Sequence, residues 1–368
     1  MNQPVRAEEV DVRFLRRAVA LAEHGWGQTA PNPMVGAVVV RDGIVVAEGW
    51  HTRYGNPHAE VEALARAGEQ ARGAHVYVSL EPCNHHGKQP PCTSALIDAS
   101  VSRVVVAARD PNPKASGGIQ SLRDAGILVD VIELPEAHEL NAPFFHAFND
   151  DTRPFITLKL ALSSDGAVAL PGDARRWLSG AESRVEVHRQ RANADAVAVG
   201  IGTVLADDPE LTVRDAPPPR VAPTRVVFDR AARLPGGSRL ARTARDLPVI
   251  VLAEAPDPAN RAVLEALGVS VVVTTGLGPA LRALRERGVR HLYVEGGARL
   301  ARALLDACVV DRLVIFQSSV TLGEGALDPF PRRWPEWAAR LPVVAQATFG
   351  GDEMTIYDLE QERCSPAS

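Results

Sequence analysis

The segment LEPCNHHGKQPPC, residues 80–92, contains two cysteines that are separated by eight residues and that each follow a proline. The run HVYVSL (75–80) leads into it and predicts a buried strand, and TSALIDAS (93–100) follows it and predicts a helix. This alternation continues outward and predicts an α/β fold in which helices cover a mixed sheet. The further strands are expected over 34–40, 44–50, 103–108 and 127–134, and the further helices over 11–24, 57–68 and before Gly126.

The two cysteines can supply thiolates to a metal site. The helix predicted over 57–68 carries a His-Ala-Glu triplet in its first turn. One imidazole and two thiolates, from His58, Cys83 and Cys92, suit zinc and leave a fourth tetrahedral position open for water. Glu60 can hydrogen-bond such a water molecule and carry its proton. Each feature alone is commonly a surface pair or a pair of core residues, but the combination predicts a catalytic zinc site.

Two further histidines, His85 and His86, lie between the cysteines, so a different set of metal ligands is conceivable. Their place inside the loop nevertheless suits contact with a substrate better. Two thiolates and one distant histidine also leave this loop free to reach outward. We therefore predict that His85 binds substrate rather than metal.

Length and charge limit the class of protein. The chain has 368 residues, enough for two domains, and a net charge of −5. Residues 1–150 carry 13 basic and 18 acidic side chains, and the remainder carries 27 of each. This charge predicts no attraction to nucleic acid or to a membrane surface. Because neither an apolar run of about 18 residues nor a signal-peptide core is present, and the four cysteines are too few for a disulfide scaffold, we expect a soluble, cytoplasmic protein.

The polar segment NDDTRP (149–154) predicts a domain boundary. We expect one domain over 1–150, a second over 151–362, and a disordered tail over 363–368. The second domain is also predicted to be α/β. Its expected strands are FITLKLAL (155–162), DAVAVG (195–200), TRVVFD (224–229), PVIVLA (248–253), SVVV (270–273), HLYVEG (291–296) and LVIFQ (313–317).

Two glycine-rich turns follow predicted strands of the second domain, Gly-Ile-Gly-Thr at 200–203 and Gly-Gly at 296–297. Free backbone N–H groups at the start of a helix can bind phosphate, so the two turns together could hold the pyrophosphate of a dinucleotide. Leu205 stands where a Rossmann fingerprint has its third glycine, which disfavours a standard dinucleotide-binding fold. From the residues alone, each turn is equally well a tight connection between strand and helix.

Motifs over nearly the whole chain resemble the family of bifunctional riboflavin-biosynthesis deaminase–reductases. The resemblance implies a cytidine-deaminase-like α/β/α domain, a dihydrofolate-reductase-like α/β domain, and a homo-oligomer. It implies zinc-dependent deamination of 2,5-diamino-6-(5-phosphoribosylamino)pyrimidin-4(3H)-one to 5-amino-6-(5-phosphoribosylamino)uracil, and then NADPH-dependent reduction of the ribosyl to the ribityl chain. The matching motifs are PNPMVGAVVV (31–40), GWHTRYGNPHAE (49–60), LEPCNHHGKQPPC (80–92), DPNP (110–113), LKLALSSDG (158–166), RRWLSG (175–180), VGIGTVLADDPELTVR (199–214) and VEGGARLA (294–301).

The resemblance also implies roles for individual residues. In the first domain it implies zinc on His58, Cys83 and Cys92, with Glu60 as proton shuttle and Asn32 as a substrate contact. Asp207 and Glu295 are candidates for the proton donor of the reduction. The residues matched to NADPH are Ala161, Trp177, Thr203, Asp207 and the turn beginning at Gly297. The residues matched to the sugar-phosphate substrate are Arg175, Arg191, Leu211, Arg214 and Glu295.

The chain departs from the family pattern at several positions. The Arg that usually follows the DPNP motif is missing, so phosphate affinity would have to come from Lys88 or Lys114. Gln89 stands where the family usually has Thr before Pro-Pro-Cys. Arg230 stands where the family often has Ser beside the cofactor. We hypothesise that Arg230 meets the 2′-phosphate of NADPH.

Three other functions share parts of this pattern. RNA-editing deaminases have the His-Ala-Glu and Pro-Cys motifs, but they need a basic face, which the net negative first domain does not favour. A non-catalytic zinc-stabilised protein would close the site with four protein ligands and would not need Glu60. The remaining alternative is an active deaminase with a decayed reductase half, because the second domain carries more substitutions.

Overall fold

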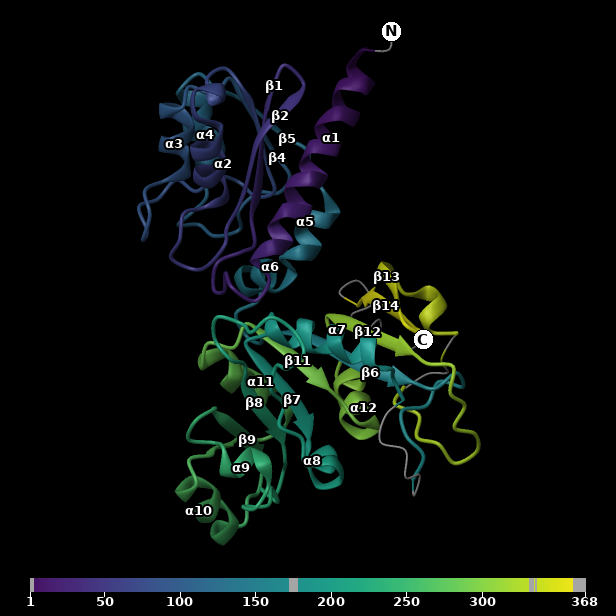
Figure 1. Cartoon of the computed structure of the whole chain (residues 1–368). Coiled ribbons are helices and arrows are strands. Elements are labelled where there is room, and N and C mark those ends of the chain that lie inside the picture. Colours follow the sequence, from purple (N-terminus) through teal and green to yellow (C-terminus); the bar gives the residue numbers. More distant parts are fainter. Residues whose placement is uncertain (1–2, 172–177, 331–333, 335, 360–368) are drawn as a thin grey trace, which may run out of the picture. The chain divides into compact units, whose positions relative to one another are not determined.

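The chain divides into two compact units, Met1–Asn149 and Asp150–Ser368. Figure 1 shows the computed structural model, which describes residues 3–171, 178–330, 334 and 336–359. Each unit has its own β-sheet and its own apolar clusters, so each is described by itself. The expected tail, 363–368, lies outside the described residues. Within the described ranges, no helix is both long enough and apolar enough to cross a membrane.

The first unit contains a five-stranded sheet with the strand order β2-β1-β3-β4-β5. Strands β1 and β2, which correspond to the strands expected over 34–40 and 44–50, form an antiparallel hairpin, and β1 also pairs antiparallel with β3. Strands β3, β4 and β5 are parallel, so the expected mixed sheet is confirmed. The strands are β1 (Gly36–Arg41), β2 (Ile44–Trp50), β3 (His75–Val78), β4 (Arg103–Val106) and β5 (Leu128–Val131).

Helices cover both faces of this sheet (Figure 1). Successive side chains of a strand point to opposite faces. In β1, Ala37 and Val39 pack with residues of α2, α3 and α4, and Val38 and Val40 pack with residues of α1 and α5. The unit is therefore three-layered, α/β/α. Its helices are α1 (Gln3–Ala22), α2 (Ala59–Ala67), α3 (Cys92–Asp98), α4 (Gly118–Asp124), α5 (Pro135–Leu140) and α6 (Ala142–Asn149), with 3-10 turns at Glu23–Gly25 and Gly68–Ala71.

Helix α2 packs unusually close to β2. A β-carbon built on Gly49 would lie 2.4 Å from the carbonyl oxygen of Ala59 and 2.5 Å from the backbone nitrogen of Ala63. Only a glycine leaves room for this approach. His58, in an extended conformation, caps the start of the helix, and Gly68, with a φ of 55°, ends it. The contact therefore fixes the height of the first turn of α2 above the sheet.

The second unit contains a nine-stranded sheet with the order β10-β9-β8-β7-β11-β6-β12-β14-β13. The seven strands from β6 to β12 are parallel, and all seven were predicted from the sequence. The antiparallel hairpin β13–β14 was not predicted, because β13 is mostly exposed and lacks an apolar pattern. The strands are β6 (Phe155–Leu162), β7 (Ala196–Gly200), β8 (Thr224–Phe228), β9 (Val249–Ala253), β10 (Ser270–Val273), β11 (His291–Glu295), β12 (Arg312–Gln317), β13 (Val343–Phe349) and β14 (Asp352–Asp358).

Apolar clusters lie on both faces of this sheet, with Ala196 and Ala198 of β7 in one and Val197 and Val199 in the other. Strands β7 to β10 proceed toward one edge, and β11 then returns between β7 and β6. Ligands of α/β sheets bind at the carboxyl ends of strands where the order reverses in this way. The helices are α7 (Ala181–Ala192), α8 (Ile201–Asp207), α9 (Arg239–Arg242), α10 (Pro258–Ala266), α11 (Leu277–Glu286) and α12 (Ala298–Asp306), with a 3-10 turn at Ala338–Arg340.

Candidate active sites

His58, Cys83 and Cys92 converge in the first unit, where their candidate ligand atoms all lie within 4.8 Å of one another. Nδ1 of His58 is 3.3 Å from Sγ of Cys92 and 3.5 Å from Sγ of Cys83. His58 caps α2, Cys92 begins α3, and Cys83 comes from the loop after β3. Both cysteines are buried. Three separate elements thus present one imidazole and two sulfurs to a common point.

The electrostatics of this cluster fit a divalent cation. A hydrogen bond from the Cys92 thiol, together with His58, lowers the pKa of Cys83 to about 4. The same contact with Cys83, and burial, raise the pKa of Cys92. The two sulfurs therefore oppose each other's ionisation, and a coordinated cation removes that conflict because its thiol ligands are deprotonated outright. The donor set is one that zinc prefers.

Glu60 lies in the first turn of α2 and is 3% exposed. Burial raises the pKa of Glu60 to about 7; His58 opposes the rise and Cys83 adds to it. Its Oε2 atom is buried and has no hydrogen-bond partner among the residues that the structure describes. A buried polar atom without a partner needs an explanation, and a water molecule at the ligand cluster supplies one. The carboxyl group is well placed to exchange a proton there.

Asn32 lies beside this cluster. Its Nδ2 is 3.4 Å from Nε2 of His51, whose ring packs edge-on against His58 with 5.2 Å between the ring centroids. Nδ1 of His51 is 3.1 Å from the carbonyl oxygen of Pro57, and burial lowers the pKa of His51. His51 is not among the residues predicted from the sequence. Its signal was a further histidine in the stretch GWHTRYGNPHAE.

The loop between the two cysteines contacts the stretch that precedes His58. Nζ of Lys88 lies 4.2 Å from the ring centroid of Tyr54, and Nε2 of Gln89 donates to the carbonyl of Gly55 at 3.0 Å. Nδ1 of His85 is buried and has no hydrogen-bond partner within the described part of the chain. His85 therefore keeps a polar atom available close to the site.

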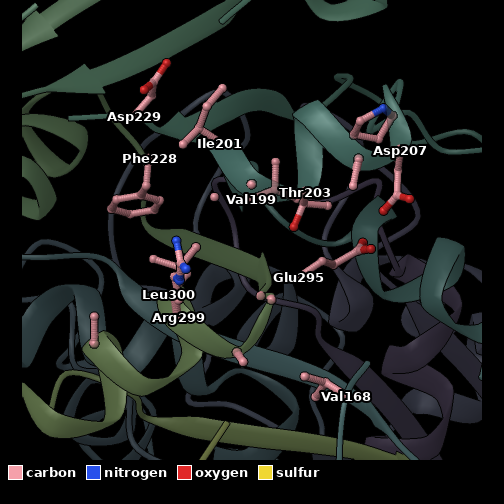
Figure 2. Close-up of a pocket in the computed structure, with 18 of the residues that line it drawn as sticks. Val168, Val199, Ile201, Thr203, Asp207, Phe228, Asp229, Glu295, Arg299 and Leu300 are labelled. Carbon is pink, nitrogen blue, oxygen red and sulfur yellow. The ribbon is translucent and has the colours of Figure 1, made fainter. Parts of the chain in front are cut away.

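The second unit holds a cleft of about 1720 Å³, whose lining includes the carboxyl ends of β7 and β11 (Figure 2). Arg175 and Trp177 lie outside the described residues. The structure brings the other residues predicted for this unit to the same cleft. Those lining residues are Ala161, Thr203, Asp207 and Gly297 from the NADPH set, and Arg191, Leu211, Arg214 and Glu295 from the substrate set.

The two glycine-rich turns lie side by side in this cleft. A β-carbon built on Gly297 would be 3.5 Å from Oγ1 of Thr203, and one on Gly200 would be 3.6 Å from Cβ of Leu300. Gly200 caps α8 and Gly297 caps α12, so both helices begin at the cleft (Figure 2). Backbone N–H groups at such positions bind phosphate oxygens. This juxtaposition fits the pyrophosphate of one dinucleotide.

A buried group of charges lies between α7, β6 and β11. The Arg191 guanidinium forms a two-point ion pair with Glu295, and its Nη1 donates to the carbonyl of Thr212 at 2.8 Å. Burial by itself raises the pKa of Glu295, but Arg191 and Lys159 hold it below its usual value. Burial lowers the pKa of Lys159. Lys159 was not predicted from the sequence, although a lysine within the apolar strand FITLKLAL was a signal.

Three other residues predicted for this cleft, two from the substrate set and Asp207 from the NADPH set, differ in environment. Arg214 is half exposed, and its Nη1 donates to Glu210 at 2.9 Å and to Thr212 at 3.1 Å. Leu211 is 3% exposed, packs in an apolar cluster, and has a left-handed backbone with a φ of 54°. Asp207, at the end of α8, is exposed. Arg214 is thus the more accessible of the two described arginines in the substrate set.

Arg230 and Glu254 line another part of the cleft, just after β8 and β9. Nε of Arg230 is 2.7 Å from Oε2 of Glu254, and the Arg230 side chain is 84% exposed. Phe228 and Asp229 precede Arg230 in the same lining (Figure 2). The guanidinium group of Arg230 is therefore accessible to a ligand in the cleft.

Two protein-family models match the chain. Residues 8–108 match the zinc-binding region of cytidine and deoxycytidylate deaminases. Residues 154–333 match the RibD C-terminal domain. Fold and sites together define the class: a bifunctional enzyme that joins a zinc-dependent deaminase unit to an α/β reductase unit.

Several relatives match over most of their length. Riboflavin biosynthesis protein RibD of Aquifex aeolicus is 42% identical over 321 residues, which is 86% of this chain and 89% of that protein. RibD of Escherichia coli is 39% identical over 341 residues, with the same two shares of 86% and 89%. The structure of Acinetobacter baumannii RibD has a TM-score of 0.80 at 35% identity and covers 95% of this chain and 99% of that one. The chain belongs to the RibD family of bifunctional riboflavin-biosynthesis enzymes.

Family membership confirms the predicted fold class, a cytidine-deaminase-like domain followed by a reductase domain. The cofactors are zinc in the deaminase and NADPH in the reductase. The alternative of a decayed reductase half is not favoured, because the reductase model matches residues 154–333. The RNA-editing and non-catalytic interpretations do not agree with the paired deaminase and reductase domains.

Proposed function

We propose that the first domain, residues 1–150, deaminates 2,5-diamino-6-(5-phosphoribosylamino)pyrimidin-4(3H)-one and releases ammonia. The second domain, residues 151–362, then reduces the ribosyl chain of the product, 5-amino-6-(5-phosphoribosylamino)uracil. The observation that supports this proposal is the convergence of one imidazole and two sulfurs beside the buried Oε2 atom of Glu60, which has no hydrogen-bond partner among the described residues. A relative from Thermotoga maritima, with a TM-score of 0.80 at 34% identity, is named as the deaminase and reductase of these two compounds.

In the deaminase, we assign His58, Cys83 and Cys92 to zinc, which when bound supplies Lewis-acid activation of a water molecule. Glu60 accepts one proton of this water through its available oxygen and delivers it to a ring nitrogen. It then takes the remaining proton from the hydroxyl group added to the ring and delivers it to the departing amine. The water oxygen replaces the amine on the ring, and ammonia leaves.

Substrate recognition in the deaminase is assigned to the residues around this cluster. Asn32 lies beside His51 and can hydrogen-bond the pyrimidine ring. His85 offers a buried nitrogen without a partner in the described chain, which suits a polar group of the substrate. Lys88, in the same loop, and Lys114, in the turn after Asp110, supply positive charge for the phosphate in place of the missing arginine.

In the reductase, NADPH when bound supplies the hydride that reduces carbon 1′ of the ribosyl chain. We assign its binding to the two adjacent helix starts and to the cleft residues beside them, and the substrate phosphate to Arg214 with Arg175. Arg191 is already bonded to Glu295, so its main role is to hold that carboxylate. The residues of the NADPH set are Ala161, Trp177, Thr203, Asp207 and Gly297, and Leu211 completes the substrate set.

We assign proton donation in the reduction to Lys159, and we assign Glu295, which the sequence also offered as a donor, to orienting it. Both line the cleft, and burial lowers the pKa of Lys159, which favours release of its proton. The low pKa of Glu295 makes it an anion that orients Lys159 and the substrate hydroxyls. Asp207 is exposed at the end of α8 and is the weaker candidate.

Two reciprocal variants test the assignment. Glu60→Gln is expected to lower deamination by roughly 10²–10⁴-fold, the usual contribution of a general acid–base group, and to leave zinc content and NADPH-dependent reduction intact. Glu295→Gln is expected to abolish most reduction and to leave deamination intact. Ammonia release and NADPH oxidation, each assayed with its own substrate, measure the two activities. A variant that lost both activities with its fold preserved would contradict the division of labour.

We also propose that Arg230 binds the 2′-phosphate of NADPH. Exposed ion pairs are worth at most about 1 kcal/mol, so Arg230 can exchange Glu254 for a phosphate at little cost. A guanidinium binds phosphate oxygens through two parallel hydrogen bonds. We further propose a homo-oligomer, on the basis of the family resemblance, and a cytoplasmic location, on the basis of the composition of the sequence.

A further inference from the structure

Glu81 lies between β3 and the zinc ligand Cys83, and it is 7% exposed. Its Oε1 accepts hydrogen bonds from the backbone N–H groups of Gly117, at 3.0 Å, and Ile119, at 3.2 Å. Its Oε2 accepts from the backbone N–H of Asp110 at 3.3 Å. An ionised carboxylate only accepts hydrogen bonds, and its bonds are stronger than neutral ones. One side chain thus binds both ends of the stretch from 110 to 119.

The stretch 110–118, which we call the DPNP loop, also packs directly on the segment that carries Cys83. The backbone N–H of Asn84 donates to the carbonyl of Ala115 at 3.0 Å. A β-carbon on Gly118 would lie only 1.8 Å from the carbonyl oxygen of Pro82. No side chain fits at that contact, so the two backbones touch. Ala115 packs in one buried cluster with both zinc-ligand cysteines, which places the loop at the edge of the site.

The DPNP loop has its own internal hydrogen bonds. Oδ1 of Asp110 accepts from the backbone N–H of Asn112 at 2.8 Å, and Oδ1 of Asn112 accepts from that of Lys114 at 3.0 Å. The loop is therefore a preformed turn. Its internal bonds do not set its distance from the metal ligands, whereas the three bonds to Glu81, together with the backbone contacts to Pro82 and Asn84, do.

We propose that Glu81 is a positioning residue for deamination, which holds the DPNP loop at the distance from the zinc ligands that substrate binding requires. This rests on the proposed deaminase function, in which Lys114 of this loop supplies positive charge for the substrate phosphate. The three hydrogen bonds of the Glu81 carboxylate go to the backbone of the loop and of α4, and to neither the ligand atoms nor Glu60. Its effect is therefore expected on substrate binding rather than on metal binding or proton transfer.

The first test is the variant Glu81→Gln. The amide replaces one accepting oxygen by an NH₂ group, which then faces a backbone N–H and repels one end of the loop. We expect the KM for deamination to rise at least tenfold, with kcat within about threefold of the wild type. Zinc content is expected to stay at the wild-type level. Reduction of the deaminated compound by the same polypeptide should not change and serves as an internal control for folding.

The matched control is Asp11→Asn. Asp11 is another strongly bonded, buried carboxylate of the first unit. It accepts hydrogen bonds from Tyr77 at 2.7 Å and from Arg103 at 2.8 Å, and these partners lie outside the DPNP loop. If Glu81 only stabilised the fold, both variants would change the kinetics in parallel with their loss of stability. We expect Asp11→Asn to lower stability and to leave the KM unchanged. Equal KM values for the two variants would overturn the proposal.

Amide hydrogen exchange tests the loop without using the activity. In Glu81→Gln, the amides of Asp110, Gly117 and Ile119 are expected to exchange at least tenfold faster, and in Asp11→Asn at the wild-type rate.

Loss of zinc from Glu81→Gln, or an unchanged KM with faster exchange, would overturn the positioning role. If the wild type released no ammonia, the deaminase function would fail, whereas faster exchange at the three amides would still support Glu81 as the anchor of the loop. Should Glu81→Gln not fold, Glu81→Asp keeps the charge but has a shorter reach, and we expect it to raise the KM as well.

Discussion

His291 is a half-buried titratable side chain that the reductase holds in its neutral form. Its Nδ1 lies 3.2 Å from the carbonyl oxygen of Asn193, and its Nε2 lies 2.9 Å from Oγ1 of Thr157. A carbonyl can only accept, so Nδ1 carries the proton and Nε2 accepts from the threonine hydroxyl. Both nitrogens are satisfied without a charge, and burial lowers the pKa of His291 to about 4. The residue therefore links the stability of the reductase to pH.

We predict that acid destabilises the reductase through His291. In the unfolded chain a histidine has a pKa of about 6.5, so between roughly pH 6.5 and 4 the unfolded state binds the additional proton. The free energy of unfolding then falls as the pH falls, by about 3 kcal/mol over this window. An NMR titration, with the resonance assigned from its loss in His291→Gln, should show the imidazole neutral down to about pH 4. Titration near pH 6.5 in the folded protein would contradict the prediction.

The exposed cation of Arg230 gives a prediction about cofactor choice. Arg230→Ala is expected to weaken binding of NADP⁺ by roughly tenfold and to leave the Kd for NAD⁺ nearly unchanged, because only the former carries the 2′-phosphate. Glu254→Gln, which removes the competing carboxylate, should tighten NADP⁺ binding slightly. Equilibrium binding measures both constants without turnover. An unchanged ratio of the two Kd values in Arg230→Ala would refute the assignment.

At the scale of elements, the close contact between α2 and β2 connects the sheet to the zinc site. His58 and Glu60 both belong to the start of α2, so their position depends on the helix backbone lying against Gly49. The atoms that an added methyl group would meet are backbone atoms of Ala59 and Ala63, which cannot swing away. The helix itself would have to move.

We therefore predict that Gly49→Ala lowers the stability of the first unit by about 2 kcal/mol or more and weakens zinc binding. The control is Gly202→Ala in α8, where a β-carbon meets nothing within 4 Å. This variant should be as stable as the wild type or slightly more stable, because alanine favours a helix. Thermal unfolding and metal analysis measure the two effects. Wild-type zinc content and Tm in Gly49→Ala would show that α2 adapts without moving the ligands.

At the scale of the whole molecule, each unit carries its own core and its own site. Zinc binds only the folded first unit, and a ligand stabilises the state to which it binds. We predict that chelation abolishes deamination and lowers the Tm of the first unit by several degrees. Reduction of the deaminated compound should persist, and added zinc should restore deamination. Loss of reduction upon chelation would show that the two units depend on one another.

Much of the fold could be predicted because its signals are local. Strands β6 to β12 each form an apolar run, and parallel strands buried on both faces need such runs. The hairpin β13–β14 escaped prediction because its exposed residues carry little apolar signal. The candidate zinc ligands and the acid beside them could be proposed because one histidine, two cysteines and a glutamate in this spacing have few other uses.

Other functional residues could not be found from the sequence, since their roles depend on contacts between distant segments. Glu81 looks like an ordinary acidic residue until the DPNP loop is seen to bind its carboxylate. The role that we propose for Lys159 depends on the ion pair of Arg191 and Glu295 beside it.

Residue patterns within single segments were sufficient to predict the α/β class of both halves and to propose the zinc ligands and the acid beside them. Short-range periodicity and residue type carry that information, because hydrophobic burial and metal-ligand preference act on each segment alone. The contacts between distant segments became known only from the three-dimensional structure. One example is the contact between Thr203 and Gly297, which brings the two glycine-rich turns together at the nucleotide cleft. Such contacts arise when strands far apart in the chain become neighbours in one sheet. The order of the strands cannot be predicted from any single segment, because it depends on how all of them pack together.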